Sequence, residues 1–143
     1  MKSHNPLGLT TKRRGAIGEC IFEMDALKKN LEVYAPLCDD MGIDYLIRHK
    51  DKYYTIQVKY HRSQKTQTAV CIKIKPCPAD IIAVPFSHGG MYQCFYVWNR
   101  NKKRCWNMNI SVIRPLNNQK KNIHFSKDYL RFPPIKKGEQ HEK

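Results

Sequence analysis

The stretch GIDYLIRHKDKYYTIQVKY, residues 42–60, decides the fold that we expect. An apolar run at residues 45–47, a polar tip at 48–52 and a second run at 53–60 are typical of two β-strands joined by a tight turn. Successive side chains on a strand point to opposite faces, so Gln57 and Lys59 share one face. Residues 54, 56, 58 and 60 take the other face. If the strands pair, Asp44 at the start of the first strand lies beside Gln57 and Lys59 at the end of the second.

The composition predicts one globular domain with a polyanionic partner. The 143 residues are 41% hydrophobic, enough for a core, and 26 Lys and Arg against 12 Asp and Glu give a net charge of +14. Such an excess favours nucleic acid, because basic side chains that contact phosphates release counterions. No stretch is apolar enough for a membrane span, and the chain opens without a secretion signal. We therefore expect a cytoplasmic protein that is nucleoid-associated when bound to DNA, with no membrane partner.

The six cysteines do not form a metal-binding motif. None belongs to a Cys-x-x-Cys pair, and no histidine lies at zinc-finger spacing from a cysteine pair. A zinc site at Cys71 and Cys77 is one interpretation. Buried, reduced thiols are the interpretation that we favour.

A helix is predicted at about residues 15–30, after a flexible basic arm at residues 1–14. Glu19 and Glu23 lie four apart on the flank of its apolar stripe, and Glu19 is a candidate functional carboxylate. The stripe repeats at three- and four-residue spacing and contains Ile17, Ile21, Met24, Leu27 and Leu31.

Further strands are predicted around the hairpin. An edge strand precedes it at residues 31–37, where Pro36 ends the run. After it we expect strands at 69–74, at 80–86 (buried on both faces and ended by Pro85) and at 93–99, the last paired with 104–110. A helical turn capped by Ser126 is predicted at 124–129, and a flexible tail at 133–143. The single domain spans residues 15–132.

The convergence of Asp44, Gln57 and Lys59 is suited to metal-assisted cleavage of a phosphodiester. Mg²⁺ prefers hard oxygen ligands, which Asp44, the Gln57 amide and the Val58 carbonyl supply. Lys59 then orients or deprotonates the attacking water, and Glu19 from the helix holds a water at the metal. The plainer interpretation, surface polar residues on a solvent-facing strand, is equally consistent with the spacing alone.

Basic and polar side chains outside this group are candidates for DNA contacts. Those in segment 71–114 suit a β-ribbon in the major groove. Those in 63–65 suit phosphate or groove contacts, and a solvated loop is the equal alternative. The candidates are Arg13, Arg14, Ser63, Gln64, Lys65, Lys73, Lys75, Arg100, Lys102, Lys103 and Arg104.

Residues 15–63 resemble the PD-(D/E)XK nuclease superfamily. The match is Asp44, then Gln57-Val58-Lys59 on a hairpin, with Gly18-Glu19 upstream, and it is closest to the small group I intron homing endonucleases of cyanobacterial type. Ile43 stands where Pro is usual, and Gln57 replaces an acid, which implies weaker metal affinity. The resemblance implies an α/β fold, restriction-endonuclease-like, with a mixed core sheet, flanking helices and an added β-ribbon.

The function that we expect is site-specific, Mg²⁺- or Mn²⁺-dependent cleavage of double-stranded DNA by a homo-oligomer, a dimer or tetramer. One alternative is a Holliday-junction resolvase. Another is a non-catalytic, basic nucleic-acid-binding protein, in which Asp44 and Glu19 are incidental. In that protein the aromatic residues form a stacking platform for single strands, although core packing explains them equally well: Tyr92, Tyr96, Trp98 and Trp106.

Overall fold

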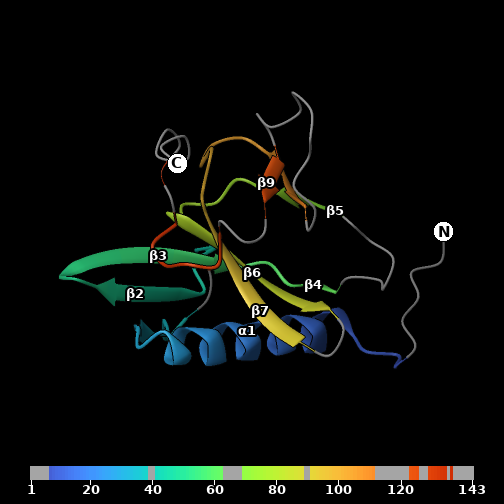
Figure 1. The fold of residues 1–143 in the computed structure, drawn as a ribbon, viewed down its shortest axis with the longest axis horizontal. Helices are drawn as coiled ribbons and strands as arrows, with labels where there is room; N and C mark the ends of the chain where they lie inside the picture. Colours follow the sequence, from blue (N-terminus) through green and yellow to red (C-terminus); the bar gives the residue numbers. More distant parts are fainter. Residues whose placement is uncertain are drawn as a thin grey trace.

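The chain folds into a mixed α/β domain in which one helix and a small second sheet cover a central sheet (Figure 1). The computed structural model describes residues 7–38, 41–62, 69–88, 91–111, 123–125, 129–134 and 136. The central sheet has the strand order β1-β2-β3-β6-β4, with β7 paired to β6, and the second sheet has the order β5-β8-β9. The elements are α1 (Thr11–Lys28), β1 (Glu32–Tyr34), β2 (Tyr45–His49), β3 (Lys52–Val58), β4 (His61–Arg62), β5 (Ala69–Ile74), β6 (Ile81–His88), β7 (Met91–Trp98), β8 (Trp106–Ser111) and β9 (Ile123–Phe125).

The predicted hairpin is confirmed as β2 and β3. They pair antiparallel, with Tyr45 opposite Ile56 and His49 opposite Lys52. Lys50 and Asp51 form the two-residue turn, and both have positive φ (49° and 60°), as in the turns that match the twist of paired strands. The predicted edge strand is confirmed as β1, which pairs with β2 alone among the described strands.

Strand β6 continues through Pro85, where we expected it to end. The Lys59 amide donates to the Ala83 carbonyl (2.8 Å). In a parallel pair, the carbonyl of the same residue accepts from the amide two residues further along the partner strand, so the Lys59 carbonyl faces the nitrogen of Pro85. Proline has no amide hydrogen to donate. The ladder accordingly ends with β3 at Val58 and resumes with β4 at His61, in the same register along β6. Pro85 is tolerated in a central strand because it lies at this interruption.

Helix α1 begins earlier than predicted and buries a different face. Thr10 caps it, its hydroxyl accepting from the Arg13 amide (3.3 Å), so Arg13 and Arg14 belong to the helix and not to a flexible arm. The buried helix residues are Gly18, Ile21, Phe22 and Ala26. Of the predicted stripe, only Ile21 and Leu31 are buried, whereas Ile17, Met24 and Leu27 are exposed. The small residues on the buried face let the helix approach the sheet closely.

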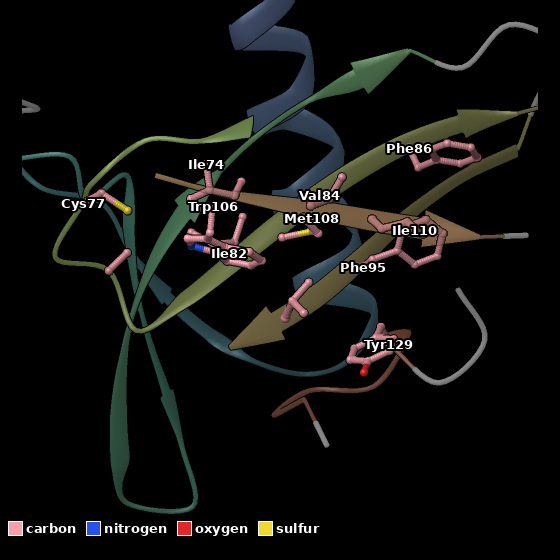
Figure 2. Close-up of a cluster of buried hydrophobic side chains, with 12 residues drawn as sticks. Ile74, Cys77, Ile82, Val84, Phe86, Phe95, Trp106, Met108, Ile110 and Tyr129 are labelled. Carbon is pink, nitrogen blue, oxygen red and sulfur yellow. The ribbon is translucent and has the colours of Figure 1, made fainter. Parts of the chain in front are cut away.

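Two hydrophobic cores lie on opposite faces of the central sheet. On the helix side, Phe22 packs with Tyr45, Ile56 and Tyr96. On the other side, Ile82 and Val84 pack with side chains of β5 and β8, as Figure 2 shows for Ile74, Trp106, Met108 and Ile110. Strand β6 contributes to both cores, and residues 81–86 are all buried, as predicted.

Strand β8 does not pair with β7, which corrects the predicted hairpin of residues 93–99 and 104–110. It pairs with β5 and β9 in the second sheet. Asn99 directs the chain out of the central sheet: its side-chain amide donates to the Cys77 and Ala79 carbonyls (3.1 and 2.9 Å), and its oxygen accepts from Trp106 Nε1 (3.0 Å). These bonds turn the segment after β7 toward the second sheet.

The C-terminal part also differs from the prediction. Residues 123–125 are strand β9, where the predicted helical turn was to begin, and Tyr129 lies in a 3₁₀ turn. Ser126 and the rest of the predicted turn lie outside the described residues. Within the described residues α1 is the only α-helix, where flanking helices were expected. Pro133 and Pro134, assigned to a flexible tail, belong to the packed domain: Pro134 is buried, and its carbonyl accepts from Trp98 Nε1 (2.9 Å).

The thiols are only partly buried. Cys77 and Cys94 are buried, as expected, whereas Cys20, Cys38, Cys71 and Cys105 are exposed. Among the described residues, no group of three or more His, Cys, Asp or Glu side chains is placed to hold a metal ion, which leaves the zinc interpretation of Cys71 and Cys77 without support.

Asp80 joins β3 to β6 through a polar network that we expect to depend on pH. Its carboxylate accepts from the Thr55 amide (3.0 Å) and from Lys102 Nζ (2.8 Å). Burial alone would raise the pKa of Asp80, but the bonds from Lys102 and Thr55 outweigh burial and lower the pKa below its usual value. A lowered pKa stabilises the fold above the unfolded-chain value of about 3.9, and that contribution is lost as the pH falls further.

We therefore expect the Asp80→Asn variant to be less stable than the parent at pH 7 but to lose less stability between about pH 5 and pH 3. Urea unfolding at several pH values measures this difference. Asp51→Asn, at an exposed turn carboxylate, is the control and should follow the parent. Equal acid sensitivity in the parent and Asp80→Asn would contradict the role of this network.

Candidate active site at the end of the hairpin

The start of β2 and the end of β3 are joined through the Asp44 side chain. The Asp44 amide donates to the Ile56 carbonyl (2.9 Å), and the Asp44 carboxylate Oδ2 accepts from the Val58 amide (2.7 Å). The carboxylate thus takes a main-chain donor at the strand end and is fixed next to the segment 57–59. This placement agrees with the predicted proximity of Asp44 to the end of the second strand.

Gln57 projects from the face of the central sheet that is opposite to α1. It pairs with Ile82 in the parallel register, and Ile82 belongs to the core beneath the second sheet. Ile56 and Val58 pack on the helix side, so the predicted alternation of faces along β3 is confirmed. Both Gln57 and Lys59 are half-buried, with Lys59 held through its amide where β3 stops.

The helix reaches this strand end at Gly18. A Cβ atom built on Gly18 would overlap Cβ of Tyr60 and lie 3.0 Å from its Cγ and 3.5 Å from its Cα. Tyr60 directly follows Lys59, so this contact fixes the half-buried Glu19 near the end of β3. Helix α1 covers the face of the central sheet that is opposite to Gln57.

A buried tyrosine links the same helix to Asp44. Tyr45, the neighbour of Asp44, donates from its hydroxyl to Glu23 Oε1 (2.6 Å). Burial raises the pKa of Tyr45 above its usual value, and the carboxylates of Glu23, Glu19 and Asp44 add to the increase. The charges of Glu19 and Asp44 therefore both act on this hydroxyl. Tyr45 could not be identified from the sequence, because its contact depends on the packing of α1 against β2.

The Tyr45→Phe variant tests this link through its response to alkaline pH. A raised tyrosine pKa stabilises the fold below the unfolded-chain value of about 10, and the contribution is lost above it. We expect the variant to lose about 1 kcal/mol at pH 7 with its hydrogen bond, and to lose less stability than the parent between about pH 9 and pH 11. Tyr53→Phe, at an exposed position of the same hairpin, is the control. Parallel curves for the parent and Tyr45→Phe would contradict the assignment.

The donor atoms near the end of β3 suit a hard divalent cation. Asp44 offers a carboxylate, Gln57 an amide oxygen and Val58 a main-chain carbonyl, all of them oxygen donors of the kind that Mg²⁺ and Mn²⁺ accept. A carboxylate has capacity for several partners, so the bond from the Val58 amide does not exhaust Asp44. The residues present therefore fit the expected metal. Because Gln57 is an amide and not an acid, the site has one carboxylate fewer than it would have with Asp or Glu at this position.

The predicted DNA contacts are distributed over several elements. Arg13 and Arg14 are exposed in the first turn of α1, and Lys73 is exposed on β5. Lys102 differs from the rest because its ammonium binds Asp80. Ser63, Gln64 and Lys65 lie outside the described residues. Lys75, Arg100, Lys103 and Arg104 are exposed in the segments that adjoin β5 and β8.

The aromatic residues do not form one exposed platform. Tyr96 and Trp106 are buried in the two cores, and Trp98 is half-buried against Tyr54. Only Tyr92 of the four is exposed. The stacking interpretation is therefore wrong for Tyr96 and Trp106, which are core residues.

The mixed α/β fold of this chain has a counterpart among solved structures. The domain is similar to the structure of a bacterial homing endonuclease, I-Ssp6803I, with a TM-score of 0.55 and 15% sequence identity over 78% of this chain and 80% of that chain. No family model matches the sequence, and no curated protein matches it. At this identity the similarity concerns the fold. The one described helix, α1, is not long and apolar enough to cross a membrane.

Proposed function

We propose that the protein is a site-specific, metal-dependent endonuclease of the PD-(D/E)XK type that cuts double-stranded DNA. The observation that carries the proposal is the hydrogen bond that the Asp44 carboxylate accepts from the Val58 amide. Val58 lies between Gln57 and Lys59 in the sequence, so this bond fixes the carboxylate beside both residues. The net charge of +14 and the structural similarity to a homing endonuclease support DNA as the substrate. By the same similarity we propose a homing-type enzyme. The resemblance of residues 15–63 to the homing endonucleases of group I introns extends the proposal to that group.

Each residue has a distinct role in the proposed reaction. Asp44, the Gln57 amide oxygen and the Val58 carbonyl would hold Mg²⁺ or Mn²⁺, which would lower the pKa of water and offset phosphate charge. Lys59 orients the attacking water as an ammonium or takes the proton of that water as a neutral amine, and its positive charge stabilises the phosphate as negative charge accumulates. Glu19 accepts a hydrogen bond from a water and holds it in position. Proton transfer by such groups contributes about 10²–10⁴-fold to rate.

Cutting both strands of a duplex requires more than one copy of this chain. One domain carries one such site and therefore cuts one strand, whereas a symmetric dimer or tetramer presents two sites to the antiparallel strands. Sedimentation with a DNA duplex measures this stoichiometry.

The test is cleavage of a large randomised duplex library, with Mg²⁺, with Mn²⁺ and with EDTA, followed by sequencing of the ends. We expect metal-dependent ends at one long recurring motif and none with EDTA. Ends placed by branched structure and not by sequence would contradict site specificity and indicate a junction resolvase. Tight, salt-sensitive binding without any cutting would contradict the nuclease and indicate a binding protein.

A further inference from the structure

The second sheet has an outer face that carries polar side chains directed away from the core. On β5 and β8 the inward positions are apolar and belong to the core that Figure 2 shows, including Ile74, Trp106 and Met108. The alternate positions, Lys73 and Asn107, are Cα partners in the antiparallel register and are both exposed. Two residues along, Cys71 is exposed opposite the half-exposed Asn109.

Two asparagines on one face of a strand are unusual, because asparagine is depleted from strands. Asn99 shows what a structural asparagine does in this chain, since its side chain bonds to Cys77, Ala79 and Trp106. In contrast, no hydrogen bond joins the side chains of Asn107 or Asn109 to another described residue. The packing of the described residues therefore does not explain these two amides.

This face lies on the side of the central sheet from which Gln57 projects. Gln57 pairs with Ile82, and Ile82 packs beneath β5 and β8. Figure 1 shows β5 and β9 on the opposite side of the central sheet from α1. A duplex that contacts the candidate site from the Gln57 side is therefore close to the second sheet as well.

We propose that Asn107 and Asn109 read adenines in the major groove of the DNA that this protein binds, an inference that rests on the DNA-binding part of the proposed function. The major groove admits two β-strands side by side, and an asparagine amide makes two hydrogen bonds to N6 and N7 of adenine. Alternate residues of a strand are about 6.8 Å apart, close to two base-pair steps of about 3.4 Å. Asn107 and Asn109 thus contact bases that are separated by one base pair, with Lys73 adjacent to Asn107.

The experiment selects the sequences that the protein binds from a randomised duplex library. It is done in EDTA, so that no cutting interferes, with the parent and with the variants Asn107→Ala, Asn109→Ala and Cys71→Ala. We expect the parent to enrich two adenines separated by one base pair. Each asparagine variant should lose the preference at one of these positions by about tenfold or more and keep the other. Cys71→Ala changes the same face without removing a hydrogen-bonding amide and should select the parent motif.

Three results would overturn the inference. They are a parent that enriches no sequence, asparagine variants that keep every parental preference, and a uniform loss of affinity without a change in motif, which indicates phosphate contacts. All variants should keep the parental melting temperature, since the substituted side chains lie outside the core. Cleavage with Mg²⁺ is measured separately: a parent that selects the motif but cuts nothing contradicts the nuclease and still supports base reading.

Discussion

Lys59→Ala is expected to lower the rate of DNA cleavage by about 10²–10⁴-fold while leaving DNA affinity within a few-fold of the parent. Lys59 directly follows Val58, whose amide binds Asp44 at the end of β3, and in the proposed reaction its side chain acts on the phosphate and the water. One cation among 26 Lys and Arg contributes little to overall binding. Single-turnover cleavage and equilibrium binding at one fixed salt concentration measure the two quantities.

Lys52→Ala is the matched control for this prediction. Lys52 is on the same strand but at the hairpin turn, where it is exposed. Its variant should cut and bind like the parent. If Lys59→Ala cut at the parental rate, or if binding and cutting fell together in that variant, the role assigned to Lys59 would be wrong.

Gly18→Ala is expected to destabilise the protein by about 1–3 kcal/mol and to slow cleavage. The added methyl group would overlap Cβ of Tyr60, and the Tyr60 backbone lies directly behind it. Either α1 or the segment that follows Lys59 must move, and both carry groups of the candidate site. Thermal unfolding and single-turnover cleavage measure the two effects.

Gly15→Ala, in the same helix, is expected to have the opposite sign. A Cβ atom there meets nothing within 4 Å, so alanine only improves helix propensity and stabilises by about 0.5–1 kcal/mol. The pair separates close packing at Gly18 from a general effect of glycine in a helix. Stabilisation of similar size by both substitutions would show that α1 does not contact Tyr60 as described.

Patterns confined to one hairpin were predictable from the sequence, because alternation and turn chemistry are local. Strands β2 and β3, the face of Gln57 and the proximity of Asp44 all follow from residues 42–60. The buried face of α1 was not predictable by the same means. Met24 and Leu27 continue a regular apolar stripe, but the helix packs through Gly18 and Ala26, since only small residues permit its close approach.

Strand partners and contacts between elements depend on the whole chain. Nothing local indicates that β8 pairs with β5 and not with β7. The Asn99 side chain is consistent with this pairing, because it bonds to residues about 20 positions away in the sequence. The bond from Tyr45 to Glu23 and the contact of Gly18 with Tyr60 likewise join segments far apart in the sequence. The sequence therefore identified the candidate groups on the hairpin but not the residues that position the helix beside them.

The central claim is that a divalent metal is held where β2 begins and β3 ends. Titration of Mn²⁺ into the protein–DNA complex, followed by electron paramagnetic resonance, tests it most directly. Asp44→Asn is the informative variant, because its amide oxygen can still accept from the Val58 amide and preserve the strand end. Asp51→Asn, at the other end of the hairpin, is the control. We predict Mn²⁺ binding by the parent and by Asp51→Asn, weakened at least tenfold in Asp44→Asn. Equal Mn²⁺ affinity in all three proteins, or no binding by the parent, would contradict the account.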